Sequence, residues 1–135
     1  MKLSLESDYA LRIVLYVYKT NEIHLTSHIV EKCQIPRSLG FKIITKLVNQ
    51  KILKSFPGRN GGILPTRDPA NISIYDVIGV IENLTIKECL DTPESCEWRN
   101  GKCSVCQEIR KVRNTMILEL KKINFKYLLE REEVL

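Results

Sequence analysis

The sequence lacks the hydrophobic segments of membrane and secreted proteins. No run of about 18 or more apolar residues occurs, so no transmembrane helix is expected. The apolar N-terminal stretch is interrupted by Glu6, Asp8 and Arg12, whereas a signal peptide needs an uninterrupted apolar core. We therefore expect a cytoplasmic protein that has no membrane partner.

Catalytic motifs are also missing. The sequence has no glycine-rich phosphate-binding loop ahead of a helix and no nucleophile elbow. His24 and His28 are four residues apart and could chelate a metal, but a loop position and an exposed helix position describe them better. These absences favour a binding protein over an enzyme.

Acidic residues are absent from one long segment, Cys33 to Arg67, which holds seven Lys and Arg residues. The rest of the chain has 14 basic and 16 acidic residues, so this segment carries the whole positive excess of a chain with net charge +5. Such a block is typical of a surface that meets phosphates. The alternative is a solvated basic face without a partner.

Hydrophobic periodicity and capping residues predict a winged helix-turn-helix followed by a long helix. Ser7 is expected to cap a first helix, Thr26 a second, and Pro36 to open a third that ends near Gln50. Residues 52–67 form two short apolar segments around a glycine-rich turn, with Gly61 and Gly62 at positive φ. Ser73 then caps a fourth helix that ends near Asn83.

The C-terminal part is expected to form one long dimerisation helix. Ser104 and Gln107 match a capping box, and the helix is predicted to reach Lys126 or beyond. A small winged domain cannot cover so long an apolar stripe, and a two-fold dimer contact would bury it. Packing against the chain's own domain is the alternative. The stripe consists of Val105, Ile109, Val112, Met116, Leu120, Ile123 and Tyr127.

The expected fold class is mainly α with a small β-hairpin. We divide the chain into a winged helix-turn-helix DNA-binding domain at 1–83, a cysteine-rich loop at 84–103, and a dimerisation helix with C-terminal tail at 104–135.

The second helix of a helix-turn-helix enters the major groove of DNA, so the outward side chains of the third helix are DNA-contact candidates. Arg37 and Ser38 are placed to reach bases, and Lys42 and Lys46 to reach phosphates. Arg59 and Asn60 at the hairpin tip are placed to enter the minor groove. The predicted contacts are Arg37, Ser38, Lys42, Thr45, Lys46, Arg59 and Asn60.

Four cysteines within 18 residues indicate a metal centre, because a reducing cytosol disfavours disulfides. With Ser104 as N-cap, Cys106 occupies the second helical position, where the helix dipole stabilises a thiolate. Four thiolates suit zinc, a [2Fe–2S] or a [4Fe–4S] centre. A single tight C-x2-C pair favours iron–sulfur, and exposed redox thiols are the alternative without metal. Cys33 stands apart and is expected to be buried. The candidate ligands are Cys89, Cys96, Cys103 and Cys106.

Several segments together resemble the Rrf-type iron–sulfur regulators of bacteria, the group that includes IscR, NsrR and RirA. They are the opening MetLysLeu with SerAspTyrAlaLeuArg, the helix IleProArgSerLeuGlyPheLysIleIleThrLysLeu, the wing ProGlyArgAsnGlyGly, and the loop that begins GluCysLeu. The resemblance spans almost the whole chain. It implies a homodimer with crossing C-terminal helices, a cluster loop close to the DNA-binding domain, and promoter binding that depends on the cluster.

The resemblance leaves the fourth ligand open. IscR-like members have a histidine three residues after the last loop cysteine, and here that position is Cys106. NsrR-like members use an aspartate of the partner subunit, which matches Asp8 here. A different alignment makes Cys106 the third family cysteine and Cys103 an extra one. We prefer Cys103 as third and Cys106 as fourth, because they complete a thiolate set within one chain.

The resulting hypothesis is a homodimeric transcription regulator that binds double-stranded promoter DNA and senses iron–sulfur status, redox state or nitric oxide. A first alternative keeps DNA binding but places structural zinc or redox thiols in the loop. A second is an electron carrier or cluster-transfer protein that does not bind DNA.

Overall fold

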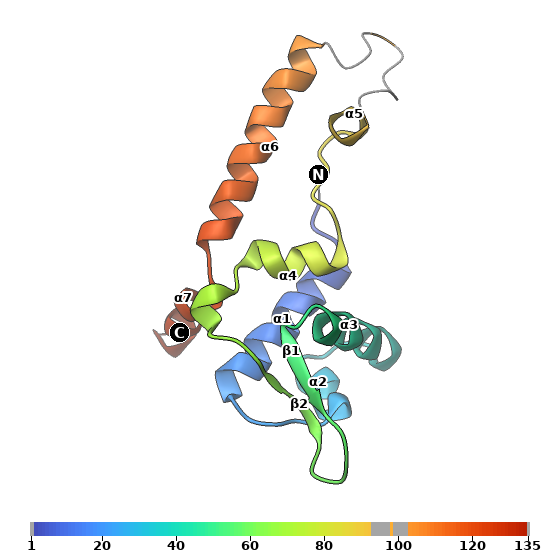
Figure 1. Ribbon diagram of the computed structural model, residues 1–135, viewed down its shortest axis with the longest axis vertical. Helices are drawn as coiled ribbons and strands as arrows, with labels where there is room; N and C mark the ends of the chain where they lie inside the picture. The colour runs from blue at the N-terminus through green and yellow to red at the C-terminus, as the bar shows by residue number, and fades with distance from the viewer. Residues whose placement is uncertain (1, 93–97, 99–102, 135) are drawn as a thin grey trace.

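The computed structural model describes residues 2–92, 98 and 103–134, and shows a mainly helical fold with one antiparallel hairpin (Figure 1). In chain order the elements are α1 (Leu5–Thr20), α2 (Thr26–Lys32), α3 (Arg37–Asn49), β1 (Leu53–Phe56), β2 (Gly62–Pro65), a 3-10 turn (Pro69–Asn71), α4 (Ile74–Ile81), α5 (Glu88–Asp91), α6 (Ser104–Lys122) and α7 (Phe125–Val134). Helices α1 to α4 and the hairpin form one packed body, which we call the winged-helix unit, and α6 projects away from it. The predicted fold class is confirmed.

The core of the winged-helix unit comes from the apolar faces of its helices. Ile13 of α1, Ile29 of α2 and Ile43 of α3 are fully buried in one cluster. Gly40 lets α2 and α3 approach closely, because a Cβ atom there would lie 2.3 Å from the Val30 side chain. Any larger residue at this position would push the two helices of the helix-turn-helix apart.

The wing is the hairpin of β1 and β2, in which Leu53 pairs with Pro65 and Phe56 with Gly62. Positive φ angles fall on Gly58 (101°) and Gly62 (151°), so the predicted positive φ of Gly61 is wrong. Gly61 is needed for space instead, since a Cβ atom there would lie 2.1 Å from the backbone oxygen of Phe56.

Two side chains fix the base of the wing against α3. The Tyr18 hydroxyl donates to the Ile52 carbonyl at 2.7 Å and accepts from the backbone amides of Thr66 and Arg67. The Arg67 guanidinium donates to the carbonyls of Lys51 (2.9 Å) and Gln50 (3.1 Å), just beyond the C-terminus of α3. These bonds satisfy backbone carbonyls of residues 50–52, between the end of α3 and the start of β1.

The start of α1 differs from the prediction. Ser4, not Ser7, is the N-cap, because its hydroxyl accepts from the Ser7 amide at 3.1 Å. Ser7 lies in the first turn, fully buried. The hydroxyls of Ser4 and Ser7 donate to the Glu82 carboxylate, and the Ser4 amide donates to it at 3.0 Å. Glu82 therefore ties the end of α4 to the start of α1.

Helix α4 begins where predicted but ends at Ile81, earlier than the expected Asn83. Ser73 and Asp76 form a capping box, because the Ser73 hydroxyl accepts from the Asp76 amide and the Asp76 carboxylate accepts from the Ser73 amide. The segment after α4 runs beside α6 and includes the short helix α5, within the stretch predicted to be loop (Figure 1).

The expected single C-terminal helix is broken. Helix α6 ends at Lys122 and Ile123 is extended. The Asn124 side chain accepts from the Tyr127 amide at 2.9 Å, as an N-cap does, and opens α7. Phe125 is only 1 % exposed, within the core of the winged-helix unit. Tyr127 therefore belongs to α7 and not to the stripe of α6.

Most of α6 is uncovered within one chain. Cys106 is its only buried residue, and Val105, Val112 and Leu118 are more than half exposed. None of the helices in the described part of the chain is long and apolar enough to cross a membrane.

The Glu82 contact predicts a pH-dependent contribution to stability. Burial raises the pKa of Glu82, but the hydrogen bonds from Ser4 and Ser7 outweigh it and the pKa is lowered. Because the pKa of Glu82 is lower in the folded protein than in the unfolded chain, the ionised carboxylate stabilises the fold at any pH above its unfolded pKa. This stabilisation is lost as the pH falls through the pKa of the folded state. Glu82→Gln should lower the free energy of unfolding at pH 7 by about 1 kcal/mol. Urea titration should show this difference shrinking below about pH 4.

The matched control is Glu130→Gln, an exposed glutamate of α7. It should leave the free energy of unfolding unchanged both at pH 7 and below about pH 4. An equal loss for Glu82→Gln at neutral and acidic pH would show that its charge does not matter.

Candidate DNA-binding surface and thiol cluster

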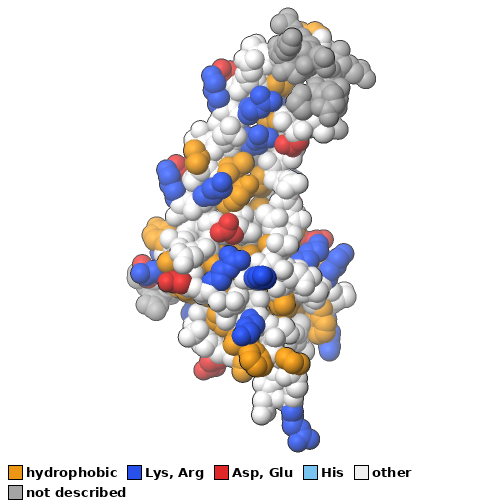
Figure 2. Space-filling view, viewed as in Figure 1, with side chains coloured by type: hydrophobic (Ala, Val, Ile, Leu, Met, Phe, Trp, Pro, Cys, Tyr) orange, Lys and Arg blue, Asp and Glu red, His pale blue; other side chains and the backbone are white. Residues whose placement is uncertain are grey.

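The predicted DNA contacts lie on two neighbouring elements of the winged-helix unit. Arg37, Ser38, Lys42 and Thr45 are exposed on α3, and Lys46 is half-buried there. Arg59 and Asn60 are exposed in the turn between β1 and β2. Figure 2 shows a basic side chain at the projecting tip, where the hairpin of Figure 1 ends. The structure thus keeps these side chains accessible to a large partner.

One apolar residue of this surface was missed by the sequence reasoning. Phe41 is half-buried on α3, and the Arg37 guanidinium lies over its ring, 5.1 Å from the ring centre. The Thr45 hydroxyl donates to the Phe41 carbonyl at 2.9 Å. Because these residues are four apart, they lie on one face of the helix. That spacing was visible in the sequence and could have indicated Phe41.

The basic residues between Cys33 and Arg67 do not all have the same role. Arg67 is exposed, but its guanidinium donates to the carbonyls of Lys51 and Gln50 after α3, so it serves the fold. Lys54 remains exposed on β1, with its ammonium 5.0 Å from the centre of the Phe56 ring. Sequence charge alone could not separate these two roles.

The two histidines are more buried than expected. His28 is half-buried rather than exposed, and its ring stacks on that of His24 with centroids 5.3 Å apart. The Nε2 atom of His24 is 2.8 Å from the Thr20 hydroxyl, and that of His28 is 3.2 Å from the Tyr16 hydroxyl. The backbone of His24 pairs with Ile63 of the wing. The His24 backbone thus links to the wing, and the two rings link to side chains of α1.

Three of the four candidate cysteine ligands converge in a second, separate site. Cys89 of α5, Cys103 just before α6 and Cys106 in the first turn of α6 are buried in one cluster, with Leu90, Ile86 and Ile109 around it. The sulfur atoms of Cys89 and Cys106 are 2.9 Å apart, longer than a disulfide bond of about 2.05 Å. We call these three residues the thiol cluster. Cys96, the fourth candidate, lies outside the described residues.

The helix start that holds this cluster differs from the prediction. Cys103 is the N-cap of α6 and Ser104 its first residue, so the predicted capping box of Ser104 and Gln107 is wrong. The backbone amide of Cys106 lowers the pKa of the Cys103 thiol, burial opposes this, and the Val105 amide also lowers it. The anion-stabilising helix terminus therefore acts on Cys103.

Cys106 shows the opposite behaviour from the expected thiolate. Its hydrogen bond with Cys89, together with burial, raises the pKa of Cys106 to about 11. A metal ion would replace the shared proton of this pair, because metals bind cysteine as thiolate.

The donor set fits a thiolate-ligated centre in its chemistry, since three buried thiols share an apolar environment at one helix terminus. Within residues 2–92, 98 and 103–134, no three His, Cys, Asp or Glu side chains are already arranged as a metal-ion site. Ligation by the thiol cluster therefore remains a prediction that calls for a local adjustment of these side chains.

The thiol cluster and the wing lie at opposite ends of the molecule (Figure 1). The resemblance implied a cluster loop close to the DNA-binding domain, whereas the three residues of the thiol cluster lie at the end of α6 that is far from the wing of their own chain. Asp8, the alternative ligand, lies on α1 and pairs with Arg12 of the same chain at 2.7 Å. A role for Asp8 as a ligand needs a second subunit.

Cys33 is confirmed as a buried residue of the main core, 9 % exposed. Burial raises the pKa of the Cys33 thiol to about 11, while the charge of Arg12 acts in the opposite direction. This thiol is separate from the thiol cluster.

Comparison with known proteins agrees with this architecture. The family model described as "Rrf2: Iron-dependent Transcriptional regulator" matches residues 3–131. Protein aau3 of Rhizobium meliloti (strain 1021) is 26 % identical over 117 residues, which are 84 % of this chain and 75 % of that protein.

Solved structures share the fold over nearly the whole chain. T. potens IscR superposes with a TM-score of 0.76 at 20 % identity, covering 98 % of this chain and 88 % of its own. A putative transcriptional regulator from Listeria innocua gives 0.78 at 24 % identity, covering 96 % and 87 %. CymR (YrzC), the global cysteine regulator of B. subtilis, gives 0.71 at 19 % identity, covering 97 % and 98 %.

Members of the matched family are transcriptional regulators rather than enzymes; they bind DNA and are generally dimeric. The match covers almost the whole chain, and the winged-helix unit and projecting helix are those of its solved neighbours. The chain therefore belongs to the Rrf2 family of transcriptional regulators.

Proposed function

We propose that this regulator acts in the cytoplasm as a homodimer, binds promoter DNA, and changes its DNA affinity with an iron–sulfur cluster held by Cys89, Cys96, Cys103 and Cys106. One observation carries the proposal. Three buried thiols gather at one end of α6, and the other end of α6 is anchored in the winged-helix unit.

The proposed DNA contacts are those predicted from the sequence. Arg37 and Ser38 stand at the N-terminus of α3, where a helix-turn-helix contacts base edges. Lys42 and Lys46 follow on the same helix and are suited to phosphates. Arg59 extends the surface to the wing tip and is suited to a narrow minor groove.

The uncovered face of α6 supports the proposed dimer. Val105 and Val112 are seven residues apart, so they lie on one face of the helix, and a second copy of α6 packed against that face would remove them from water. A two-fold arrangement also supplies a second winged-helix unit for a second DNA half-site. In such a dimer, Asp8 of the partner subunit is the alternative fourth ligand.

Iron–sulfur ligation is favoured by the softness and burial of the donors. Thiolates hold such clusters, and an apolar surrounding with few donors nearby tunes their chemistry. A bound cluster supplies a centre that responds to iron supply, oxidation or nitric oxide. The alternative, a regulator with zinc or redox thiols, is supported by the close approach of the Cys89 and Cys106 sulfur atoms.

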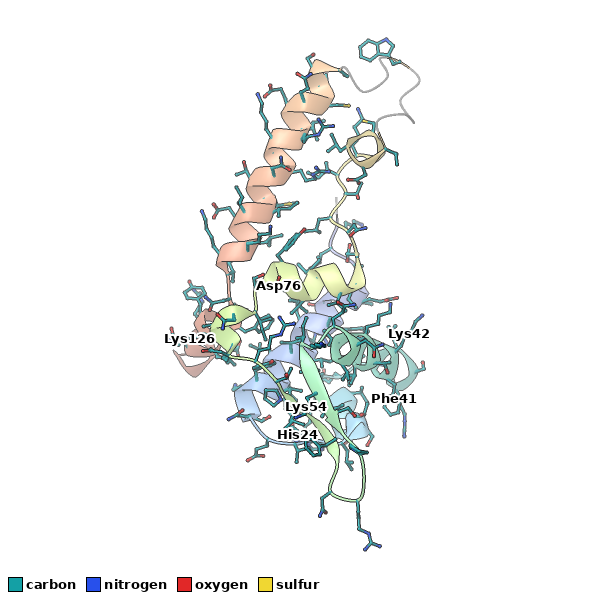
Figure 3. All side chains as sticks on the ribbon, in the orientation of Figure 1. His24, Phe41, Lys42, Lys54, Asp76 and Lys126 are labelled. Atoms are coloured by element: carbon teal, nitrogen blue, oxygen red, sulfur yellow. The ribbon has the colours of Figure 1, made fainter. Side chains whose placement is uncertain are left out.

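Salt dependence tests the DNA surface. Lys42→Ala should weaken binding to a duplex selected by the protein from a random library, and should reduce the slope of log K against log salt by about 0.9. Lys126→Ala on α7, which Figure 3 places on the opposite side of the molecule, should leave the slope unchanged. Fluorescence anisotropy at several salt concentrations measures both variants. Equal slopes for the wild type and Lys42→Ala would exclude this phosphate contact.

Metal analysis tests the thiol cluster. Cys103→Ser should lower iron and acid-labile sulfide after anaerobic purification, and visible absorption should fall with them, because one thiolate donor is lost. Cys33→Ala, in the other core, should retain the wild-type content. Zinc without iron in the wild type, or full iron in Cys103→Ser, would contradict the proposed ligand set.

A further inference from the structure

A half-open notch lies where α3 meets the hairpin. Its volume is about 280 Å³, and its lining includes Thr45, an exposed residue of α3 that is one of the predicted DNA contacts. The N-terminus of α2 forms a third wall. The lining residues are Thr26, Phe41, Ile44, Thr45, Val48, Ser55 and Ile63.

The notch is apolar although the surface around it is basic. The Arg37 guanidinium rests on the Phe41 ring, which fixes both side chains at one rim. Figure 3 shows Phe41 and Lys42 on α3, and Lys54 on the hairpin, the two elements that border the notch. No acidic residue occurs between Cys33 and Arg67. This surrounding charge selects a polyanion as the occupant.

Thr45 contributes a methyl group to the notch. Its hydroxyl donates to the Phe41 carbonyl, so the polar atom is directed to the helix backbone. The side chain that remains for a partner is therefore apolar, next to Phe41 and Val48. Within the major groove of DNA, the bases present one apolar group, the C5-methyl of thymine.

We propose that this notch recognises a thymine methyl group, with Phe41 and Thr45 as the residues that determine the preference. The inference rests on the proposed DNA-binding function and adds a base specificity to it. Arg37 at the rim then lies over the neighbouring base pair, where its guanidinium can reach a guanine edge.

Uracil substitution tests this directly, since deoxyuridine differs from thymidine by the methyl group alone. The full-length protein first selects duplexes from a random library. Each thymidine of the selected half-site is then replaced by deoxyuridine, and affinity is measured by fluorescence anisotropy. At least one replacement should lower affinity about fourfold, the value of one buried methyl-sized group.

Two variants assign the effect to the notch. Thr45→Ser removes the methyl group but keeps the hydroxyl that bonds to Phe41, so it retains the local helix structure. Phe41→Ala opens the notch further. Both variants should bind thymidine and deoxyuridine duplexes equally. The control is Phe56→Ala, an exposed aromatic residue outside the notch, which should keep the fourfold difference.

The outcomes separate this inference from the proposed function. Salt-dependent DNA binding without any effect of deoxyuridine would overturn the thymine inference and leave DNA binding intact. A deoxyuridine effect that persists in both Thr45→Ser and Phe41→Ala would also overturn it, because the methyl would then be recognised elsewhere. Failure to select any duplex would instead overturn the proposed function.

Discussion

The anchoring of α6 at its C-terminal end is the constraint on which the molecule depends. The Ile74 amide donates to the Ile123 carbonyl and the Phe125 amide to the Ile72 carbonyl, each at 2.9 Å. Phe125 then enters the core of the winged-helix unit. A helix of 19 residues is about 28 Å long, so this anchor sets the thiol cluster far from the wing.

In this arrangement the winged-helix unit is held together by internal contacts, and α6 is the one long helix that projects from it. Tyr18 and Arg67 fix the wing to the end of α3, and Glu82 joins the end of α4 to the start of α1. Helix α4 contacts both α1 and α6. A change at the far end of α6 can therefore alter the setting of two such bodies in a dimer. A coupling free energy of about 1–3 kcal/mol corresponds to a change in DNA affinity of about 5- to 150-fold.

Periodicity and turn chemistry were sufficient to predict the winged helix from the sequence. Ser73 as a cap, the hairpin within residues 52–67 and burial of Cys33 are confirmed. One error arose where a tertiary contact overrides a local signal, and another where a local cap signal was overlooked. Ser7 looked like a cap, but the Glu82 carboxylate draws it into the first turn of α1. The apolar stripe seemed to continue through Ile123, although Asn124 was a cap signal and Phe125 an available core residue.

The candidate site was predictable in its residue types but not in its geometry. Spacing indicated that the cysteines belong together, and Cys89, Cys103 and Cys106 do converge. It could not show that Cys103, rather than Ser104, caps the helix, because that depends on the backbone entering α6. Phe41 was overlooked because an apolar residue on a helix is usually assigned to the core.

The central claim is that the thiol cluster and the DNA-binding surface are energetically coupled through α6. The most direct measurement is the dissociation constant of one anaerobic preparation for its selected duplex, before and after its iron is removed by a chelator. Our account predicts at least a fivefold change in this constant, with the protein still dimeric and folded. The same dissociation constant in both states, at matched salt, would contradict it.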